Sequence, residues 1–179
     1  MNNRIGIRLF RFLYYHFAIY LPQSNKMFGV GKWVRYHLCK RIFKKCGKNV
    51  NIEKYAKFGS GEHIEIGDYS GIGVKATIPD GSIIGKYVMM GPNCFVHQRN
   101  HSFSRTDIPM MQQGFTPTKP IVIDDDVWIG RDVTIMIGRH ISKGSIIAAN
   151  CVLTKDYPEY SVVGGNPSRL IRNRKDIGR

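Results

Sequence analysis

Large apolar residues recur at every sixth position along two stretches of the chain. These anchors are Ile66, Ile72, Ile78, Ile84, Met90 and Val96 in the first stretch and Ile123, Ile129, Ile135, Ile141, Ile147 and Leu153 in the second. A period of six matches neither the α-helical period of about 3.6 nor the period of about two of an isolated strand. It suits a coil of triangular cross-section, in which each flat side uses one six-residue unit and the anchor points inward. We therefore predict an all-β fold, a parallel β-helix.

The positions between the anchors fit the same coil. Four residues after an anchor the side chain is usually small or modest, as at Ser70, Ala76, Ser82, Val88, Cys94, Val127, Val133, Ser145 and Cys151, and Arg139 is the exception. Glycine follows the anchor directly at Gly67, Gly73, Gly85, Gly91 and Gly130, where it relieves the backbone at a bend. Because Cys94 and Cys151 occupy the small inward position, we interpret both as packing residues and not as nucleophiles.

The six-residue period stops between Val96 and Ile121. The intervening sequence, "HQRNHSFSRTDIPMMQQGFTPTKP", has no such period and contains three prolines. This segment, residues 97–120, must leave the wall of the β-helix as one long excursion loop. Loops of this length in a compact domain are usually functional.

The sequence before the repeats predicts an α-helical region. Residues 4–21 and about 32–46 have helical spacing, and Gly47 is placed as a C-terminal stop. The apolar run from Leu9 to Leu21 is shorter than the ~20 residues of a membrane-spanning helix and has no signal-cleavage site. We expect a basic, aromatic-rich helical region over 1–47, the β-helix over 48–172 and a basic tail over 173–179. The helices either pack against the domain or a partner subunit, or lie in a membrane interface.

The composition adds a strong positive charge to this picture. The chain of 179 residues holds 27 Lys and Arg against 13 Asp and Glu, a formal charge of +14, which indicates an anionic partner such as a phosphorylated cofactor or a membrane surface. No nucleic-acid-binding motif accompanies the charge, so nucleic acid is not an expected partner. The four cysteines form no cluster, which favours the reducing cytoplasm.

Three segments beyond the repeat carry a family resemblance. They are "IVIDDDVWIGRDVTI", "IIAANCVLTKDYP" and "YSVVGGNPSRLIRNR". Together with the repeat and the loop histidine, they resemble the hexapeptide-repeat acetyltransferases over residues 49–172, and most closely the branch that acts on sugars in polysaccharide biosynthesis, alongside maltose and galactoside acetyltransferases. The resemblance implies a left-handed β-helix, acetyl-CoA as acetyl donor without a metal, a saccharide acceptor, and a homotrimer with its sites between subunits.

Transfer of an acetyl group to a hydroxyl requires a general base, and histidine suits that role because its pKa lies near ~6.5. His101, preceded by Asn100, matches the position of the family's catalytic histidine, and direct transfer needs no covalent enzyme intermediate. His97 follows the last anchor before the loop and is either a polar rim residue or an aid in orienting the acceptor. Asp107 is a candidate for holding the histidine tautomer, and Trp128 either packs on the outer face or lines the acyl pocket.

The resemblance also assigns cofactor-binding positions. They are Arg131, Ala149, Thr154, Lys155, Arg169 and Arg172. The last two take the places of basic residues near the nucleotide phosphates, where a guanidinium has an electrostatic reason to be. One position departs from the sugar acetyltransferases: Gly73, with Lys75 nearby, stands where they use an asparagine to contact the acceptor.

Several alternatives remain open at this point. The acceptor could be an amino sugar, serine or an antibiotic instead of a saccharide hydroxyl. A zinc enzyme similar to carbonic anhydrase would use His97 and His101 as ligands, and a non-enzymatic scaffold would bind membranes through its basic N-terminus. We expect the protein in the cytoplasm, with the inner face of the membrane as a site of association.

Overall fold

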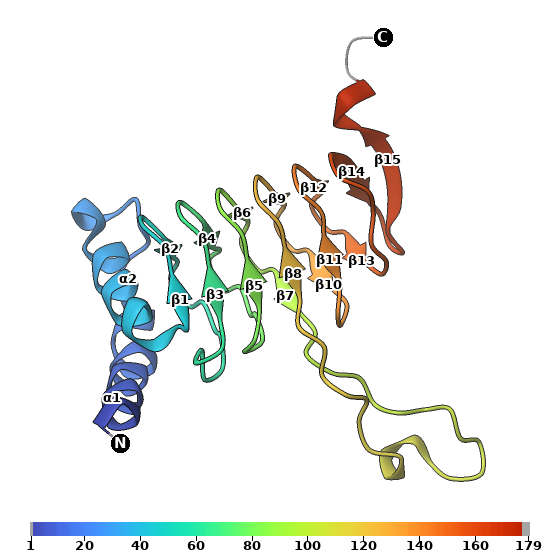
Figure 1. The fold of residues 1–179 in the computed structure, drawn as a ribbon, viewed down its shortest axis with the longest axis horizontal. Coiled ribbons are helices and arrows are strands. Elements are labelled where there is room, and N and C mark those ends of the chain that lie inside the picture. Colours follow the sequence, from blue (N-terminus) through green and yellow to red (C-terminus); the bar gives the residue numbers. More distant parts are fainter. Residues whose placement is uncertain (1, 177–179) are drawn as a thin grey trace.

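The computed structural model describes residues 2–176; residue 1 and residues 177–179, the end of the predicted basic tail, lie outside the described part. The chain forms a parallel β-helix with a pair of helices at its N-terminal end and a long arm projecting from its side (Figure 1). The predicted left-handed β-helix of six-residue units is confirmed.

Three faces make up the β-helix, and each is a stack of short parallel strands. The first face contains β1 (Lys45–Cys46), β3 (Glu65–Ile66), β5 (Ile83–Ile84), β8 (Val122–Ile123) and β11 (His140–Ile141). The second contains β2 (Asn51–Ile52), β4 (Gly71–Ile72), β6 (Met89–Met90), β9 (Trp128–Ile129), β12 (Ile146–Ile147) and β14 (Ser161–Gly164). The third contains β7 (Phe95–Val96), β10 (Thr134–Ile135) and β13 (Val152–Leu153), and β15 (Arg169–Asn173) pairs antiparallel with β14.

The anchors stack on one another along each face. On the first face, for example, Ile66 is in register with Ile84, which is in register with Ile123. Eleven of the twelve predicted anchors are buried, and Met90 is half-buried. Each coil therefore adds its anchors to a continuous apolar core, the main source of stability in such a solenoid.

The close approach of successive coils at one corner of the β-helix explains the glycines that follow the anchors. A Cβ added to Gly73 would lie 2.0 Å from the carbonyl oxygen of Gly91 on the next coil, so only glycine lets the coils approach this closely. Another corner is formed by residues in the left-handed conformation, such as Tyr69 (φ 59°) and Tyr87 (φ 58°), whose rings stack 5.4 Å apart.

The inward cysteines and Arg139 have clear packing roles. Cys94 is buried, its Sγ donates to the carbonyl oxygens of Gly91 and Gly130, and burial raises the pKa of its thiol to about 11. Arg139, the exception in the repeat, turns away from the core: its Nη1 donates to the carbonyl oxygen of Thr154 at 3.1 Å.

The N-terminal region caps the first coil. It contains α1 (Asn2–His16), η1 (Ala18–Tyr20), η2 (Met27–Gly29) and α2 (Val30–Ile42). The expected second helix was placed too far along the chain, because α2 ends at Ile42 and residues 45–46 already form β1 of the first coil. Within residues 2–176, no helix has the length and apolar character needed to cross a membrane.

A buried arginine fastens this cap to the β-helix. Arg35 is fully buried, and its guanidinium donates to the carbonyl oxygens of Ile52, Ala18, Leu21 and Pro22. Burial lowers the pKa of Arg35, yet Glu53 lies 3.9 Å from it and offsets part of that cost. The interior face of the cap is therefore held by polar contacts as well as by the buried Tyr14, Ile42 and Phe43.

Candidate active site

The excursion loop forms an arm with its own hydrogen bonds. It leaves the wall after β7 and returns before β8, as Figure 1 shows. Near its base, the backbone N–H of Thr116 donates to the carbonyl oxygen of Asn100 at 2.8 Å, and the N–H of Ser102 donates to that of Gly114 at 3.0 Å. A short 3-10 helix, η3 (Met110–Gln112), lies further out. The outgoing and returning segments of the arm are thus joined by hydrogen bonds of their own, in addition to their attachment to the β-helix.

His101 is an exposed residue on this arm. It lies opposite Phe115 in an antiparallel bridge, with the two ring centroids 4.4 Å apart. The guanidinium of Arg99 lies 4.0 Å from the centroid of the same Phe115 ring. Phe115 therefore supports the imidazole and a cation together, and both are held in position by side-chain stacking. Phe115 and Arg99 were not singled out from the sequence, because their pairing with His101 depends on how the arm folds.

Asp107 has a partner other than His101. Its carboxylate accepts two hydrogen bonds from the guanidinium of Arg105, one of them from Nε at 3.0 Å. The Arg105 guanidinium lowers the pKa of Asp107, so the carboxyl remains ionised. Among the described residues, Asp107 and His101 form no hydrogen bond with each other, so the role of Asp107 in holding the histidine tautomer stays a prediction.

His97 and Thr154 lie at one corner of the β-helix. The N–H of His97 donates to the carbonyl oxygen of Ile135, and the N–H of Met136 donates to that of Leu153, so His97, Met136 and Thr154 follow one another on successive coils. The half-buried His97 ring packs 4.9 Å from Phe95. His97 is thus fixed to the wall, whereas His101 is carried outward on the arm.

A groove runs along the third face toward the base of the arm. It encloses about 540 Å³ and is bounded by Thr77, Asp80, Phe95 and Gln98 among others. At its rim, Asp80 accepts hydrogen bonds from the hydroxyl of Ser60 at 2.6 Å and from Nδ1 of His63 at 2.7 Å. The hydrogen bond with Asp80 raises the pKa of His63. This pair was not predictable from sequence pattern, since the two residues are 17 positions apart.

Arg131 and Ala149 lie at the corner on the other side of the third face. The N–H of Asn150 donates to the carbonyl oxygen of Arg131 at 3.0 Å. Arg131 and Ala149, both exposed, therefore lie on successive coils. The Arg131 guanidinium donates to Asp132 at 2.9 Å. Trp128 is half exposed on the second face, in register with Met89 and Ile146.

The closing hairpin brings Thr154 and Arg169 together. The turn between β14 and β15 buries Ser168, whose hydroxyl accepts a hydrogen bond from the N–H of Thr154 at 3.0 Å. Arg169 and Arg172 follow on β15, and both are exposed without a carboxylate partner among the described residues. Lys155 is exposed next to Thr154, with Nζ 5.8 Å from the Tyr157 ring centroid. Two unpaired guanidiniums and a lysine at one end of the molecule are a suitable environment for phosphate groups.

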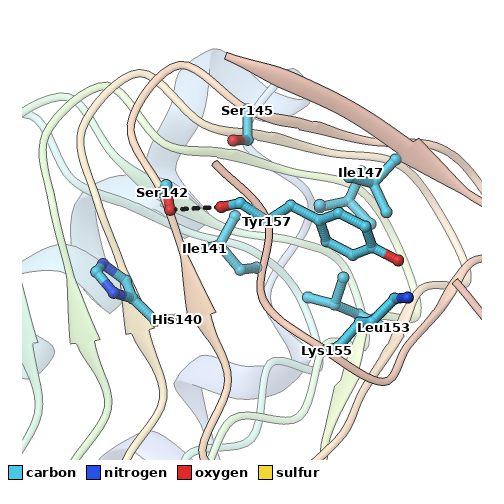
Figure 2. Close-up of a pocket in the computed structure, with 9 residues that line it drawn as sticks. His140, Ile141, Ser142, Ser145, Ile147, Leu153, Lys155 and Tyr157 are labelled. Atoms are coloured by element: carbon cyan, nitrogen blue, oxygen red, sulfur yellow. Dashed lines mark hydrogen bonds between the residues drawn. The ribbon is translucent and has the colours of Figure 1, made fainter. Parts of the chain in front are cut away.

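A small internal space lies inside the last coils (Figure 2). It measures about 10 Å³, enough for about one water molecule. Figure 2 shows the Ser142 hydroxyl bonded to the carbonyl oxygen of Tyr157, at 2.8 Å, and the nearby Ser145 hydroxyl, which is buried and has no protein partner. This space is too small for a substrate, so we exclude it from the candidate active site.

Residues 2–176 contain no group of three or more His, Cys, Asp or Glu side chains arranged to hold a metal ion. His97 and His101 in particular belong to different parts of the molecule, the wall and the arm. The other candidate residues divide between two corners of the β-helix and the closing hairpin.

A β-helix of hexapeptide units is shared with a class of acetyltransferases among known proteins. No family model matches the chain. Galactoside O-acetyltransferase of Escherichia coli is 33% identical over 144 residues, 79% of this chain and 70% of that protein. The Lactococcus lactis galactoside O-acetyltransferase is 30% identical over 142 residues, 78% and 67% of the two chains.

The solved structures agree as well. A hexapeptide-repeat-containing acetyltransferase of Vibrio cholerae, in complex with acetyl coenzyme A, superposes with a TM-score of 0.76 at 30% identity, covering 97% of this chain and 88% of that one. The chain belongs to the hexapeptide-repeat acetyltransferases. It is therefore an acyltransferase, as the resemblance implied.

Proposed function

We propose that the protein transfers the acetyl group of acetyl-CoA to a hydroxyl of a saccharide or glycan precursor, with His101 as general base. The observation that carries the proposal is the placement of His101, exposed on the arm and fixed by stacking on Phe115. The galactoside acceptors named for the two relatives, and the acetyl coenzyme A bound in the Vibrio protein, support the choice of substrates.

In this mechanism, an imidazole nitrogen of His101 accepts the proton of the acceptor hydroxyl as its oxygen attacks the thioester carbonyl. The new O–C bond forms, the C–S bond breaks, and His101 returns the proton to the departing sulfur, whose thiol has a pKa of about 8.5. Both substrates are bound together, so transfer is direct and positioning supplies much of the acceleration. The developing negative charge on the carbonyl oxygen would be stabilised by hydrogen-bond donors near the restart of the β-helix, although the backbone N–H groups of Trp128 and Gly130 donate to neighbouring coils and are not among them.

The proposed donor site uses both corners of the third face and the closing hairpin. Arg131 and Ala149 would contact the thiol arm of coenzyme A, and Thr154 and Lys155 would lie along it. Arg169 and Arg172 would bind its phosphates, since both guanidiniums are exposed and free of carboxylate partners among the described residues.

The proposal includes a homotrimer. The arm projects away from its own β-helix (Figure 1), so His101 meets a second surface only when another subunit lies beside it. We expect the arm of one subunit to pack against the neighbouring β-helix and the site to form between them. The same proposal places the enzyme in the cytoplasm, at the inner face of a membrane when its basic N-terminal region is engaged.

The acceptor is the least defined part of this proposal. At Gly73, the position that contacts the acceptor in similar sugar acetyltransferases, an asparagine would collide with the carbonyl oxygen of Gly91. The groove beside Asp80 and Gln98 lies at the base of the arm, and its polar rim is suited to sugar hydroxyls. We therefore propose this groove, and not the Gly73 position, as the place where the acceptor is recognised.

The test is an acetyl-transfer screen scored by thiol release, with nucleotide sugars, lipid-linked sugars and free saccharides as acceptors. On the acceptor found, His101→Ala should lower kcat by about 10²- to 10⁴-fold, the range for a general base, while the trimer and coenzyme A affinity stay intact. His97→Ala is the matched control and should lose far less. Near-normal turnover by His101→Ala would exclude the role we assign to this residue.

A further inference from the structure

The helical cap exposes apolar side chains on the side that does not pack on the first coil. At the start of α2, an aromatic tip is formed by Met27, Phe28, Val30 and Trp33, which are 66%, 109%, 49% and 63% exposed. On α1, Ile5, Leu9 and Phe12 form an exposed stripe with helical spacing. Both helices lie at the same end of the β-helix in Figure 1, opposite to β15. Within the described residues, Phe12 stacks on His16 and Trp33 packs on His37, yet both aromatic rings remain more than half exposed.

The backbone at the tip is unusual. Met27 (φ 48°) and Phe28 (φ 53°) are consecutive non-glycine residues in the left-handed region. Each such residue costs about 1 kcal/mol or more, and burial of the Phe28 ring within the chain does not offset that cost because the ring is fully exposed. The strained turn therefore holds an aromatic ring out into the solvent.

The charge of the cap is predominantly positive, with Arg11 paired to Glu62 and Glu53 bonded to the backbone N–H of Ser24. The chain carries eleven Lys and Arg residues and no Asp or Glu before Glu53. Lys26 lies next to the tip, and Lys40 and Arg41 are exposed further along α2. Exposed aromatic residues beside basic ones match a surface that is both apolar and negatively charged.

We propose that the helical cap docks on an anionic lipid bilayer, with the aromatic tip and the α1 stripe inserted at the headgroup level and the surrounding lysines and arginines against the lipid phosphates and carboxylates. This inference specifies the membrane association included in the proposed function, and it rests on that association alone and not on the proposed reaction. A protein partner would equally need apolar contacts, but the exposed Arg8, Lys26, Lys40 and Arg41 of the cap favour a uniformly negative surface.

Docking in this way sets the orientation of the enzyme. The cap lies at the N-terminal end, the arm leaves from the side, and β15 lies at the opposite end (Figure 1). The basic closing hairpin would then remain in water, where a soluble donor reaches it.

The test is flotation of the full-length protein with lipid vesicles, in the absence of acetyl-CoA and acceptor. The chain should bind vesicles that contain phosphatidylserine and should not bind pure phosphatidylcholine. Binding should weaken when the salt rises from about 0.1 M to about 0.5 M, because charges beyond the Debye length are screened. Phe28→Asn with Trp33→Gln should weaken binding about tenfold or more, since two aromatic side chains leave the interface.

The substitutions are chosen to keep the fold. Asparagine tolerates the left-handed conformation of Phe28, and glutamine is a good helix former at Trp33. Tyr87→Asn is the matched control: Tyr87 is an exposed aromatic residue with φ 58°, distant from the cap in sequence, and its variant should bind vesicles like the original chain.

Equal binding to both lipids, or binding unaffected by the double substitution, would overturn the proposal. So would a loss of oligomers in the double variant at unchanged vesicle binding, because the tip would then be covered by another subunit. These readouts need no acetyl transfer, so their failure leaves the proposed reaction standing, and a failed reaction leaves the docking result standing.

Discussion

The hydroxyl of Ser168 accepts a hydrogen bond from the backbone N–H of Thr154 at 3.0 Å and joins the closing hairpin to the last coil. The Thr154 and Tyr157 hydroxyls each lie 3.1 Å from the same oxygen. Ser168 thereby fixes the corner that we assign to coenzyme A relative to Arg169, the next residue along the chain.

We expect Ser168→Ala to raise the KM for acetyl-CoA by about two- to tenfold, because the hydrogen bond that holds the Thr154 backbone contributes about 0.5–1.5 kcal/mol, with little change in kcat. Steady-state kinetics with varied acetyl-CoA measures both constants. Ser161→Ala is the control, since that buried serine donates to the carbonyl oxygen of Pro158 and makes no contact with Thr154. A fall in kcat at unchanged KM would contradict this interpretation.

The stacking of Phe115 on His101 gives a second prediction. Phe115→Ala should lower kcat by about tenfold, because the imidazole loses the ring against which it is held and productive orientations become rarer. The KM for acetyl-CoA should not change, and Phe115→Tyr should restore kcat because it keeps the ring. Phe103→Ala, at an exposed position on the same arm, serves as control, and an equal loss there would attribute the effect to the arm as a whole.

Replacement of the buried Arg35 should have a large effect on stability. Arg35→Met should lower the free energy of unfolding by about 3 kcal/mol or more, because four backbone carbonyl oxygens and Glu53 lose a buried donor. Urea unfolding at fixed protein concentration would show it as a lower midpoint. Arg41→Met removes an exposed charge on the same helix and should change the midpoint little. Equal midpoints for the two variants would show that the cap does not depend on Arg35.

His63 and Asp80 give a pH-dependent prediction. The pKa of His63 is raised by its hydrogen bond with Asp80, so the pair stabilises the fold fully below the ordinary histidine pKa of about 6.5. That stabilisation is lost as the pH rises through the raised pKa. NMR titration should find His63 above its ordinary pKa, and Asp80→Asn should return it to that value. An unchanged pKa in Asp80→Asn would contradict the assignment of Asp80 as the cause.

Local pattern predicted much of this molecule. Ile66 and Ile84 were recognisable as anchors because a regular coil returns each face at a fixed interval, so position in the sequence determines position in space, whereas the register of Ile123 with Ile84 across the arm was visible only in the structure. Arg139 could not be interpreted in this way, since its contact with the carbonyl oxygen of Thr154 depends on the next coil. The end of α2 at Ile42 was also missed, because Lys45 and Cys46 continue a helical spacing but are recruited as a strand by Glu65 and Ile66.

In the candidate site, too, some features were predictable from the sequence and others were not. His101 was located from its place in the arm and from the family pattern. Its contact with Phe115 was not predictable, because the two residues are 14 positions apart in a segment without periodicity. The contact of Asp107 was not predictable either: both of its carboxylate oxygens accept hydrogen bonds from Arg105, and its role beside His101 stays a prediction.

The arm interrupts the chain without interrupting the stack. On the first face β8 begins 39 residues after β5, whereas β11 begins 18 residues after β8, yet each pair is in direct register. An insertion of variable length at this point leaves every coil below and above it unchanged. The arm can therefore vary in length and sequence, like an insert, on a framework that hardly changes.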